Sequence, residues 1–303
     1  MKLYSYTLFL DILGYSTKIK NISKEESQEI FELLNNIESL IIQYFNQASN
    51  SETYKEYTLH YTFFSDCIIL SFVPKDNIVI DENEIIFFNQ TTLEFIFTWI
   101  INVQFITLLK TGFLLRGGIS CKDIYWSDKK VVGPALIEAY HLESKVASWA
   151  RIILSEELST NLNLINHINY ISKDSNRVYS PHTLLLKDNS ENHYYYNYIG
   201  RMLARLNINN LLPKNMEEIF IKNLDENVPI WKQMISKEIY MEVLNITNDF
   251  IEEHNNIIIE NIEQVDSKIR EKYIKLKQYH NKALEDFITL NPDYKPLETL
   301  IIN

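Results

Sequence analysis

The sequence holds few of several residue types, and each shortage excludes a class of protein. Two cysteines among 303 residues are too few for a disulfide-stapled scaffold and are typical of a reducing compartment. Lysine and arginine total 29 against 40 aspartates and glutamates, so the formal net charge is −11. Because proteins that coat nucleic acid usually carry a basic surface, this balance argues against a nucleic-acid partner. The N-terminus enters strand-like sequence without a secretory leader, and we therefore expect a cytoplasmic protein.

Glycine is also rare, with six in the chain, and four of them fall within three short motifs. A chain with so few glycines is expected to use each one where the backbone takes a positive φ or approaches another segment closely. The four are Gly14, Gly117, Gly118 and Gly133. We expect tight turns or close packing at these positions.

Apolar runs long enough to span a membrane without interruption are absent from the sequence. The most hydrophobic stretch, residues 87–109, is broken by asparagine, glutamine and glutamate side chains. A membrane-spanning helix needs about 20 predominantly apolar residues. We therefore interpret 87–109 as a buried helix and expect no membrane partner.

Hydrophobic periodicity predicts strands and helices in the first part of the chain. Residues 3–11 are expected to form a buried strand that ends at Asp11, and Ser23 with Glu26 has the pattern of a capping box that opens a helix at 24–47. This order of elements predicts an α+β fold with helices on one face of a sheet. The other expected elements are a hairpin at 57–73, a loop at 75–85, a helix at 88–110, strands at 113–120 and 152–154, and a short helix from Gly133 to Ala147.

The composition becomes helical from about residue 200. We therefore divide the chain into residues 1–200 and an α-helical C-terminal region, 201–303. From Val265 to Phe287, apolar residues recur every three or four positions. This seam packs either against the chain's own core or against a second copy, and the pattern alone leaves both open.

Two aspartates adjoin apolar strands: Asp11 ends the first, and Asp66 lies in the hairpin turn. Taken alone, an aspartate at either position is typical of a helix cap or a turn. If the strand and the hairpin are neighbours in one sheet, the two carboxylates meet, and a divalent cation with oxygen ligands would keep both ionised. The segment Ile12–Tyr15 can expose successive backbone N–H groups to an anion. A cation and amide donors together suit a nucleoside triphosphate.

Four motifs together resemble the catalytic domain of the class III nucleotidyl cyclases, over about residues 3–160. They come in that family's order and at its approximate spacings. The resemblance implies a ferredoxin-like palm, a head-to-tail homodimer with sites at the interface, and two divalent metal ions, Mn²⁺ or Mg²⁺. The motifs are Phe9–Tyr15, Phe64–Asp66, Leu115–Ile119, and Gly133 followed by Ala139–Glu143.

The resemblance also implies roles for single residues. Asp11 and Asp66 would hold the metals, with Ile12 as a further metal-contacting position. Arg116 would contact the triphosphate, unless it is only a structural arginine of the strand. The phosphates would be cradled by the backbone of Ile12, Leu13, Gly14 and Tyr15.

The sequence departs from the purine-specific members of that family. Thr62 and Lys130 stand where those enzymes carry a base-reading lysine and its partner aspartate. Ile137 and His141 stand where they carry an asparagine and an arginine that stabilise the transition state. We keep Thr62 and Lys130 as candidates for the base pocket and His141 as a donor to the developing charge. A solvated lysine and a packed histidine are the simpler interpretations.

With these departures, further segments resemble the pyrimidine cyclases of Pycsar antiphage systems. That family implies conversion of UTP, or CTP, to the 3′,5′-cyclic mononucleotide and diphosphate, and a separate effector protein activated by the product. Two alternatives stay open: an adenylate or guanylate cyclase with a divergent base pocket, and a cyclase-like pseudoenzyme that binds nucleotide. The resembling segments are Arg116–Ile119, Gly133–Ala135, Glu138–Glu143, Ala150–Ile152 and Lys272–Asn281.

Overall fold

The computed structural model describes residues 2–15, 22–49, 56–76, 81–128, 130–173, 184–188, 192–204, 237–263, 267–290 and 297–302. The chain divides into two compact units. The first unit comprises Met1–Ile168 and Leu185–Tyr196, and the second comprises Asn169–Leu184 and Asn197–Asn303. Residues 205–236, which we expected to be helical, lie outside the described residues.

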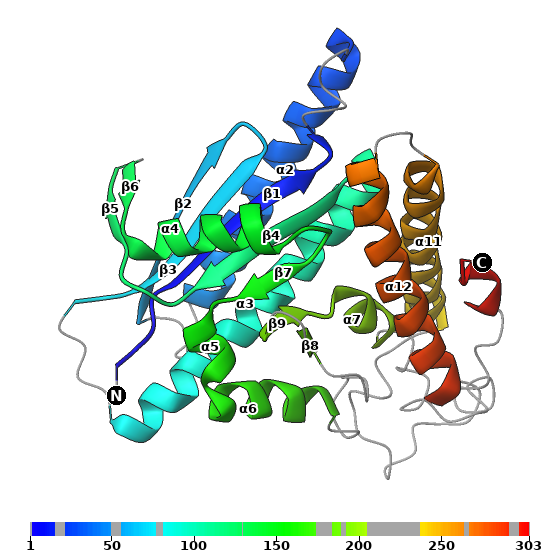
Figure 1. Cartoon of the computed structure of the whole chain (residues 1–303). Coiled ribbons are helices and arrows are strands. Elements are labelled where there is room, and N and C mark those ends of the chain that lie inside the picture. The colour runs from blue at the N-terminus through cyan, green and yellow to red at the C-terminus, as the bar shows by residue number, and fades with distance from the viewer. Residues whose placement is uncertain are drawn as a thin grey trace. The chain divides into compact units, whose positions relative to one another are not determined.

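The first unit is built on one sheet, in which the described strands follow the order β2-β3-β1-β4-β7-β9-β8 (Figure 1). Neighbouring strands pair antiparallel, except that β4 and β7 are parallel. Together with its helices this sheet confirms the predicted α+β class. The strands are β1 (Tyr6–Leu13), β2 (Tyr57–Phe64), β3 (Cys67–Pro74), β4 (Leu114–Ser120), β7 (Ile152–Leu154), β8 (Leu185–Asp188) and β9 (His193–Tyr196).

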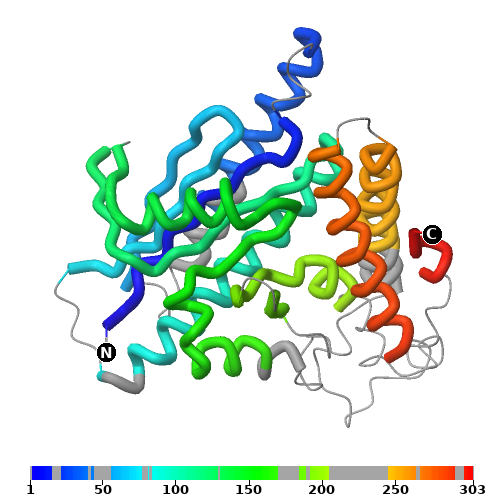
Figure 2. Tube along the Cα trace, viewed as in Figure 1, coloured from blue at the N-terminus to red at the C-terminus, as the bar shows by residue number. Residues whose placement is uncertain are grey.

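Strand β1 lies inside the sheet, with β3 on one side and β4 on the other, and Figure 2 shows the β2–β3 hairpin beside it. The prediction that the first strand ends at Asp11 is wrong. The strand continues because Ile12 and Leu13 pair with Leu115 and Leu114 of β4, and their side chains are buried in the core. Asp11 is therefore an internal residue of β1, held between two neighbouring strands.

Helix α2 (Lys24–Ser49) begins with the predicted capping box. The Glu26 N–H donates to Ser23 Oγ over 3.1 Å, and the Ser23 N–H donates to the Glu26 carboxylate over 2.8 Å. These two bonds satisfy backbone donors that the first turn of a helix leaves unpaired. The prediction of the capping box is confirmed.

Helix α3 (Glu82–Thr111) starts six residues before the predicted position. The loop predicted to reach residue 85 is therefore too long. Its acidic end belongs to the helix start, where the Asp81 N–H donates to the Glu84 carboxylate over 3.2 Å. Negative side chains are favourable in a first turn because backbone N–H groups point out of it. The helix ends as predicted at Gly112, whose φ is 65° and whose N–H donates to Leu108 O.

Helices cover both faces of the sheet, so the prediction of helices on one face is wrong. On one face, the ring of Phe95 in α3 contacts Phe72 of β3 with 5.9 Å between the centroids. The other face carries Phe9 and Ile69, and against them packs Ala139 of helix α4 (Pro134–His141). The hairpin of β5 (Tyr125–Ser127) and β6 (Lys130–Val132) lies on this second face too, because Trp126 and Val131 pack against the same cluster.

The helix predicted from Gly133 to Ala147 changes its geometry midway. Helix α4 passes at Leu142 into a π turn, η2 (Leu142–Val146), in which the Ala147 N–H donates to Leu142 O over 2.7 Å. A π turn contains one residue more than an α turn and so changes which side chains face inward. Here both Leu142 and Glu143 are buried.

One helix of the described chain, Glu84–Thr111 within α3, is long and apolar enough to cross a membrane. In the structure 61% of its most hydrophobic window is buried inside the protein. This agrees with the predicted buried helix. It is the burial expected for a helix of the protein core.

The second unit is helical in its described part. The helices are α7 (Tyr198–Ala204), α11 (Lys237–Ile262) and α12 (Ser267–Leu290), and a 3₁₀ turn follows at Leu297–Leu300. The seam residues Tyr273, Leu276, Leu284 and Phe287 of α12 are buried within the chain. Residues of α12 contact α11 and α7 of the same unit, as in the hydrogen bond between the His254 and His280 rings.

Candidate metal centre

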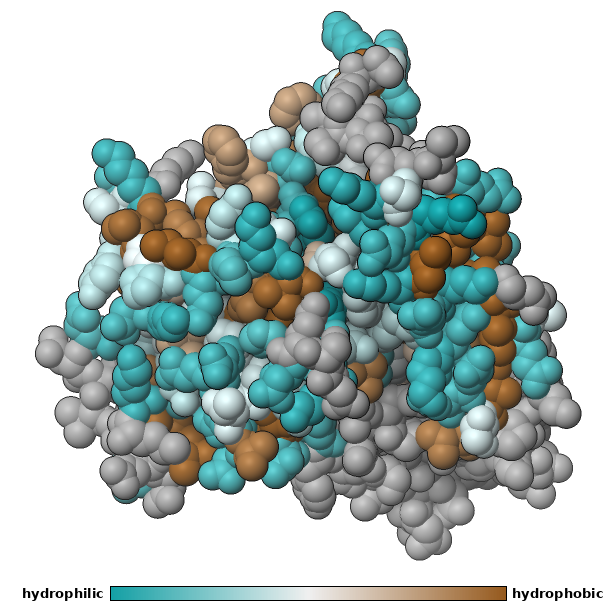
Figure 3. Space-filling model, in the orientation of Figure 1, coloured by the Kyte–Doolittle hydropathy of each residue, from teal (hydrophilic) through white to brown (hydrophobic). Residues whose placement is uncertain are grey.

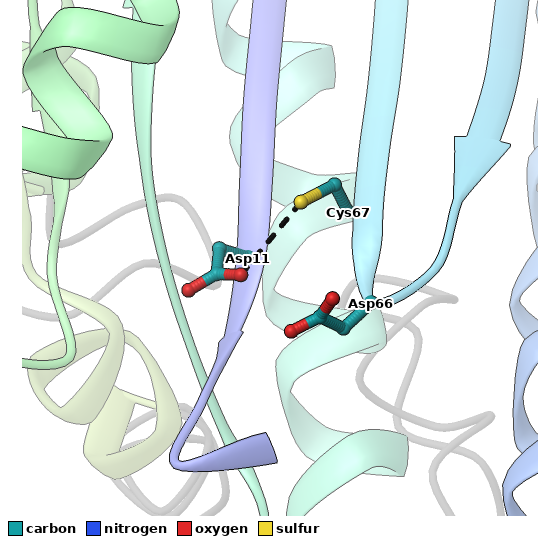
Figure 4. A group of neighbouring side chains, drawn as sticks. All are labelled: Asp11, Asp66 and Cys67. Atoms are coloured by element: carbon teal, nitrogen blue, oxygen red, sulfur yellow. Dashed lines mark hydrogen bonds between the residues drawn. The ribbon is translucent and has the colours of Figure 1, made fainter. Parts of the chain in front are cut away.

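Asp11, Asp66 and Cys67 come together where β1 and β3 meet. The β1–β3 ladder ends at the pair Asp11 and Cys67, and Asp66 lies in the turn just before β3. Ser65, the other turn residue, has a φ of 56°, which reverses the chain within two residues. One possible ligand atom from each of Asp11, Asp66 and Cys67 lies within 4.8 Å of the others. Figure 4 shows the Asp66 and Cys67 side chains beside the Asp11 carboxylate.

Arg116 and Glu143 complete this cluster on the side of β4. Arg116 is the cross-strand partner of Asp11. Its Nε and Nη2 atoms each lie 2.8 Å from Asp11 Oδ2. Nη2 also lies 2.7 Å from Glu143 Oε1. The guanidinium thus bridges two carboxylates, one from β1 and one from η2.

Burial governs the protonation of the cluster. It raises the pKa of the Asp11 carboxyl; the Arg116 guanidinium lowers this pKa and the Asp66 carboxylate raises it. Burial likewise raises the pKa of Glu143 to about 7, although Arg116 opposes the shift. For the Cys67 thiol, burial and then the Asp11 charge raise the pKa to about 12. Two carboxyl groups contact the one guanidinium, and Asp66 adds a third carboxyl group beside Asp11, so an added cation would offset the negative charge of the cluster.

The donor atoms at this place fit a divalent metal ion. Carboxylate oxygens are the ligands preferred by Mg²⁺ and Mn²⁺, and Asp11 and Asp66 supply them. A thiolate from Cys67 would suit a softer ion. The cluster can therefore hold a metal ion, and its carboxylates favour hard cations.

The four residues expected to cradle phosphate divide into two pairs. Ile12 and Leu13 belong to β1, where their backbone pairs with β4 and their side chains are buried. Gly14 and Tyr15 follow the end of the strand. Gly14 has a φ of 84°, as its expected turn requires, and the Tyr15 ring lies 6.1 Å from the Phe113 ring. Gly14 and Tyr15 therefore lie outside the sheet, whereas Ile12 and Leu13 lie within it.

The remaining predicted residues lie farther along the same side of the first unit. Thr62 of β2 pairs with Ile69 of β3, and Ile69 pairs with Phe9 of β1. Because alternate residues of a strand lie on the same face, Thr62 is on the face of the sheet that carries Asp11. Lys130 begins β6, and His141 ends α4, and both are exposed. In the described part of the chain, no hydrogen bond or ion pair joins Thr62, Lys130 or His141 to the Asp11 cluster.

Two members of the cluster, Cys67 and Glu143, are not among the residues that the sequence predicts for the site. Cys67 falls within the hairpin predicted at 57–73, directly after Asp66, and the pairing of β3 with β1 places it opposite Asp11. Glu143 ends the motif Ala139–Glu143, but the sequence predicts no role for it. The π turn directs the Glu143 side chain inward, and hydrophobic periodicity does not predict a π turn.

Comparison of the chain with protein-family models gave no match. Comparison with curated proteins gave no match either.

Proposed function

We propose that this chain is a metal-dependent pyrimidine nucleotide cyclase that converts UTP, or CTP, to the 3′,5′-cyclic mononucleotide and diphosphate. The observation that carries the proposal is the meeting of Asp11, Asp66 and Arg116 at one place in the sheet. These residues come from three separate motifs, spread over more than a hundred positions of sequence. A cation site with an adjacent guanidinium suits the chemistry of a triphosphate.

The order of the first four strands supports a cyclase-type palm. Along the chain the elements run β1-α2-β2-β3-α3-β4, and in the sheet the strands lie in the order β2-β3-β1-β4. This is the arrangement of a ferredoxin-like βαββαβ unit. The ferredoxin-like palm implied by the motifs is therefore part of the proposal.

In the proposed reaction the ribose 3′-oxygen attacks the α-phosphorus, the bond to the β-phosphate oxygen breaks, and diphosphate leaves. Asp11 and Asp66, with the backbone of Ile12, would hold two divalent ions, Mn²⁺ or Mg²⁺. When bound, these ions lower the pKa of the 3′-hydroxyl and neutralise the leaving diphosphate. The backbone N–H groups of Gly14 and Tyr15 would bind phosphate oxygens at the end of β1.

Recognition of the substrate falls to residues around this cluster. Arg116 would add its positive charge next to the triphosphate. Thr62 and Lys130 are proposed for the pyrimidine base, and His141 for the charge that develops during transfer. Each of these side chains belongs to the first unit, on the elements β4, β2, β6 and α4.

An exposed apolar surface supports the homodimer. We define the α4 patch as Phe64, Tyr125, Val132, Ile137 and Tyr140, whose exposed fractions are between 53% and 76%. Phe64 is the cross-strand neighbour of Cys67, so the patch begins beside the cluster. Figure 3 shows hydrophobic residues on the face that carries α4 and the β5–β6 hairpin. Large apolar patches typically mark interaction sites, and a second copy seated here would adjoin the proposed active site.

The proposed biological role is that of a signal synthase in antiphage defence. The cyclic nucleotide would activate a separate effector protein in the cytoplasm. The burial of helix α3 supports a place away from the membrane. The acidic charge of the chain supports a nucleotide and not a nucleic acid as the substrate.

Incubation of the purified chain with ATP, GTP, CTP or UTP in the presence of Mn²⁺ or Mg²⁺ tests the proposal. We expect mass spectrometry to find cyclic UMP, or cyclic CMP, and diphosphate. Asp11→Asn and Asp66→Asn keep the side-chain shape and remove the charge, so both are expected to abolish turnover. Products from purines alone would replace the pyrimidine assignment with an adenylate or guanylate cyclase.

A nucleotide-binding pseudoenzyme is the second candidate, and one observation favours it. Ile137, at a position where the resembling cyclases carry an asparagine, is 71% exposed and apolar. It offers no hydrogen bond to a transition state. Tight nucleotide binding without a cyclic product, measured in the same incubations, would support this candidate and exclude the enzyme.

A further inference from the structure

The two oxygens of the Asp11 carboxylate have different partners. Oδ2 receives both contacts from Arg116, Nε and Nη2 at 2.8 Å each. Oδ1 lies 3.7 Å from Cys67 Sγ, on the side of Asp66. Figure 4 shows this division, with one oxygen directed toward the sulfur and the other away from it. Arg116 thus fixes the rotation of the carboxylate and leaves Oδ1 facing the cluster of possible ligands.

Arg116 is in turn held by Glu143. The Glu143 side chain is 4% exposed, and its Oε1 lies 2.7 Å from Arg116 Nη2. Its position is set by rigid neighbours, because η2 lies directly on β4. A Cβ atom at Gly118 would come within 2.5 Å of Leu142 Cβ and of Ala139 O. The absence of a side chain at Gly118 therefore lets Glu143 approach Arg116.

We infer that Glu143 and Arg116 are positioning residues for the cation that Asp11 binds: Glu143 fixes the guanidinium, and the guanidinium orients Oδ1 toward Asp66. This inference rests on the metal site of the proposed function and deepens it. Carboxylates that bind metals are commonly held by hydrogen bonds from an outer layer of residues. Loss of such a partner typically weakens metal affinity about 10–100-fold.

Charge and orientation make different predictions for Arg116. A guanidinium beside a cation repels it, so charge alone predicts that an Arg116→Lys variant binds the cation as the native chain does. Orientation predicts weaker binding, because a lysine ammonium cannot reproduce the Nε and Nη2 contacts of the planar group. The Arg116→Lys variant therefore separates the two effects. It also keeps a cation beside the buried Glu143.

Direct measurement of Mn²⁺ affinity, by electron paramagnetic resonance of the free ion with no nucleotide present, tests the inference on the full chain. Glu143→Gln and Arg116→Lys are each expected to weaken binding about 10-fold or more. The matched control is Asp188→Asn, since Asp188 forms an ion pair with the buried Arg151 at 2.6 Å elsewhere in the same unit. It removes a comparable carboxylate, so a merely structural effect would also appear in it. We expect it to keep native Mn²⁺ affinity.

The outcomes separate this inference from the proposed function. Native Mn²⁺ affinity in Glu143→Gln, or in Arg116→Lys if Glu143→Gln does not fold, would overturn the inference while Asp11→Asn still loses the ion. Native Mn²⁺ affinity in Asp11→Asn would contradict both the metal site and the inference that rests on it. Mn²⁺ binding that depends on Glu143, in a chain that makes no cyclic nucleotide, would sustain the inference and contradict the proposed reaction.

Discussion

Gly118 shows how one residue without a side chain can determine a packing distance. It lies in β4 under helix α4, and a Cβ atom there would meet Ala139 O at 2.5 Å. Cβ atoms essentially never come within 3.0 Å of another heavy atom, so helix and strand would have to separate. The same separation would move Glu143, which follows Leu142 in η2, away from Arg116.

We therefore predict that Gly118→Ala destabilises the first unit by about 1–3 kcal/mol, the usual cost of overpacking. Denaturant unfolding followed by circular dichroism would measure it. Lys145→Ala, an exposed substitution in the same π turn, is the control and should stay within about 0.5 kcal/mol of the native chain. If the native chain and Gly118→Ala were equally stable, α4 could move away from β4 without a loss in the free energy of unfolding, and the prediction would be wrong.

The sequence allows part of the site to be predicted at this scale. The meeting of Asp11 and Asp66 follows from a strand and a hairpin placed in one sheet, and the structure brings the two together. The burial of Glu143 does not follow, because it depends on one extra residue in a helical turn. Side-chain direction in a helix changes by about 100° per residue, so such an insertion cannot be read from hydrophobic spacing.

At the scale of the elements, helix boundaries depend on polar residues as well as on apolar ones. Ser23 and Glu26 mark the start of α2 in the sequence as in the structure. Asp81 and Glu84 do the same for α3, but their surroundings are so acidic that they were interpreted as a loop. Similarly, β1 was predicted to stop at its carboxylate, although the apolar residues after Asp11 keep it in the sheet.

The capping box gives a prediction for α2. Ser23→Ala removes the acceptor of the Glu26 N–H, and we expect a loss of about 1 kcal/mol in the free energy of unfolding. Ser39→Ala is the matched control, because the Ser39 hydroxyl donates to Asn35 O within the same helix. A serine that bonds to the preceding turn adds little to a helix, so this variant should be neutral or slightly more stable. Chemical denaturation of both variants decides between them, and equal effects would contradict a capping role.

At the scale of the whole molecule, two features combine residues from several elements: the α4 patch and the buried histidines of the second unit. The patch gathers residues from β2, the β5–β6 hairpin and α4. Its exposed area would be costly to leave in water, since burial of apolar surface gives about 25 cal/mol per Å². Self-association through this patch is therefore a prediction of the proposed homodimer.

Ile137→Asp is predicted to shift the chain from dimer to monomer in analytical ultracentrifugation, because it places a charge within the α4 patch. Leu162→Asp serves as the control, since Leu162 is similarly exposed, at 62%, but begins α6 (Leu162–Lys173), away from the patch residues in sequence. It should leave association unchanged. A monomeric native chain, or a dimer that tolerates Ile137→Asp, would exclude the patch as the interface.

The second unit contains a hydrogen-bonded chain of neutral groups. Tyr198 Oη lies 2.7 Å from His254 Nε2, His254 Nδ1 lies 3.0 Å from His280 Nδ1, and His280 Nε2 lies 3.0 Å from Leu300 O. The Leu300 carbonyl can only accept, so His280 donates to it, His254 donates to His280, and Tyr198 donates to His254. Every ring nitrogen is used with one proton on each ring.

This arrangement predicts loss of stability in acid. Burial lowers the pKa of His254 well below its usual range and that of His280 to about 4. The unfolded rings take up protons near pH 6.5, about their ordinary pKa, so the stabilisation is complete above that pH and is lost as the pH falls toward 4. His280→Gln keeps a donor for Leu300 and removes one titrating ring. Its free energy of unfolding should fall less steeply over this pH interval, and an unchanged slope would contradict the prediction.

The internal position of Asp11 in β1 makes the candidate metal centre depend on the register of that strand. Successive residues of a strand point to opposite faces, so a slip of one residue in β1 would turn Asp11 into the core under α3 and expose the neighbouring apolar side chains. The mispaired sheet would lose its core and its carboxylate cluster in the same event. Only molecules with the correct register can therefore assemble the cluster, so formation of a well-packed core and formation of the candidate metal centre depend on the same strand pairing.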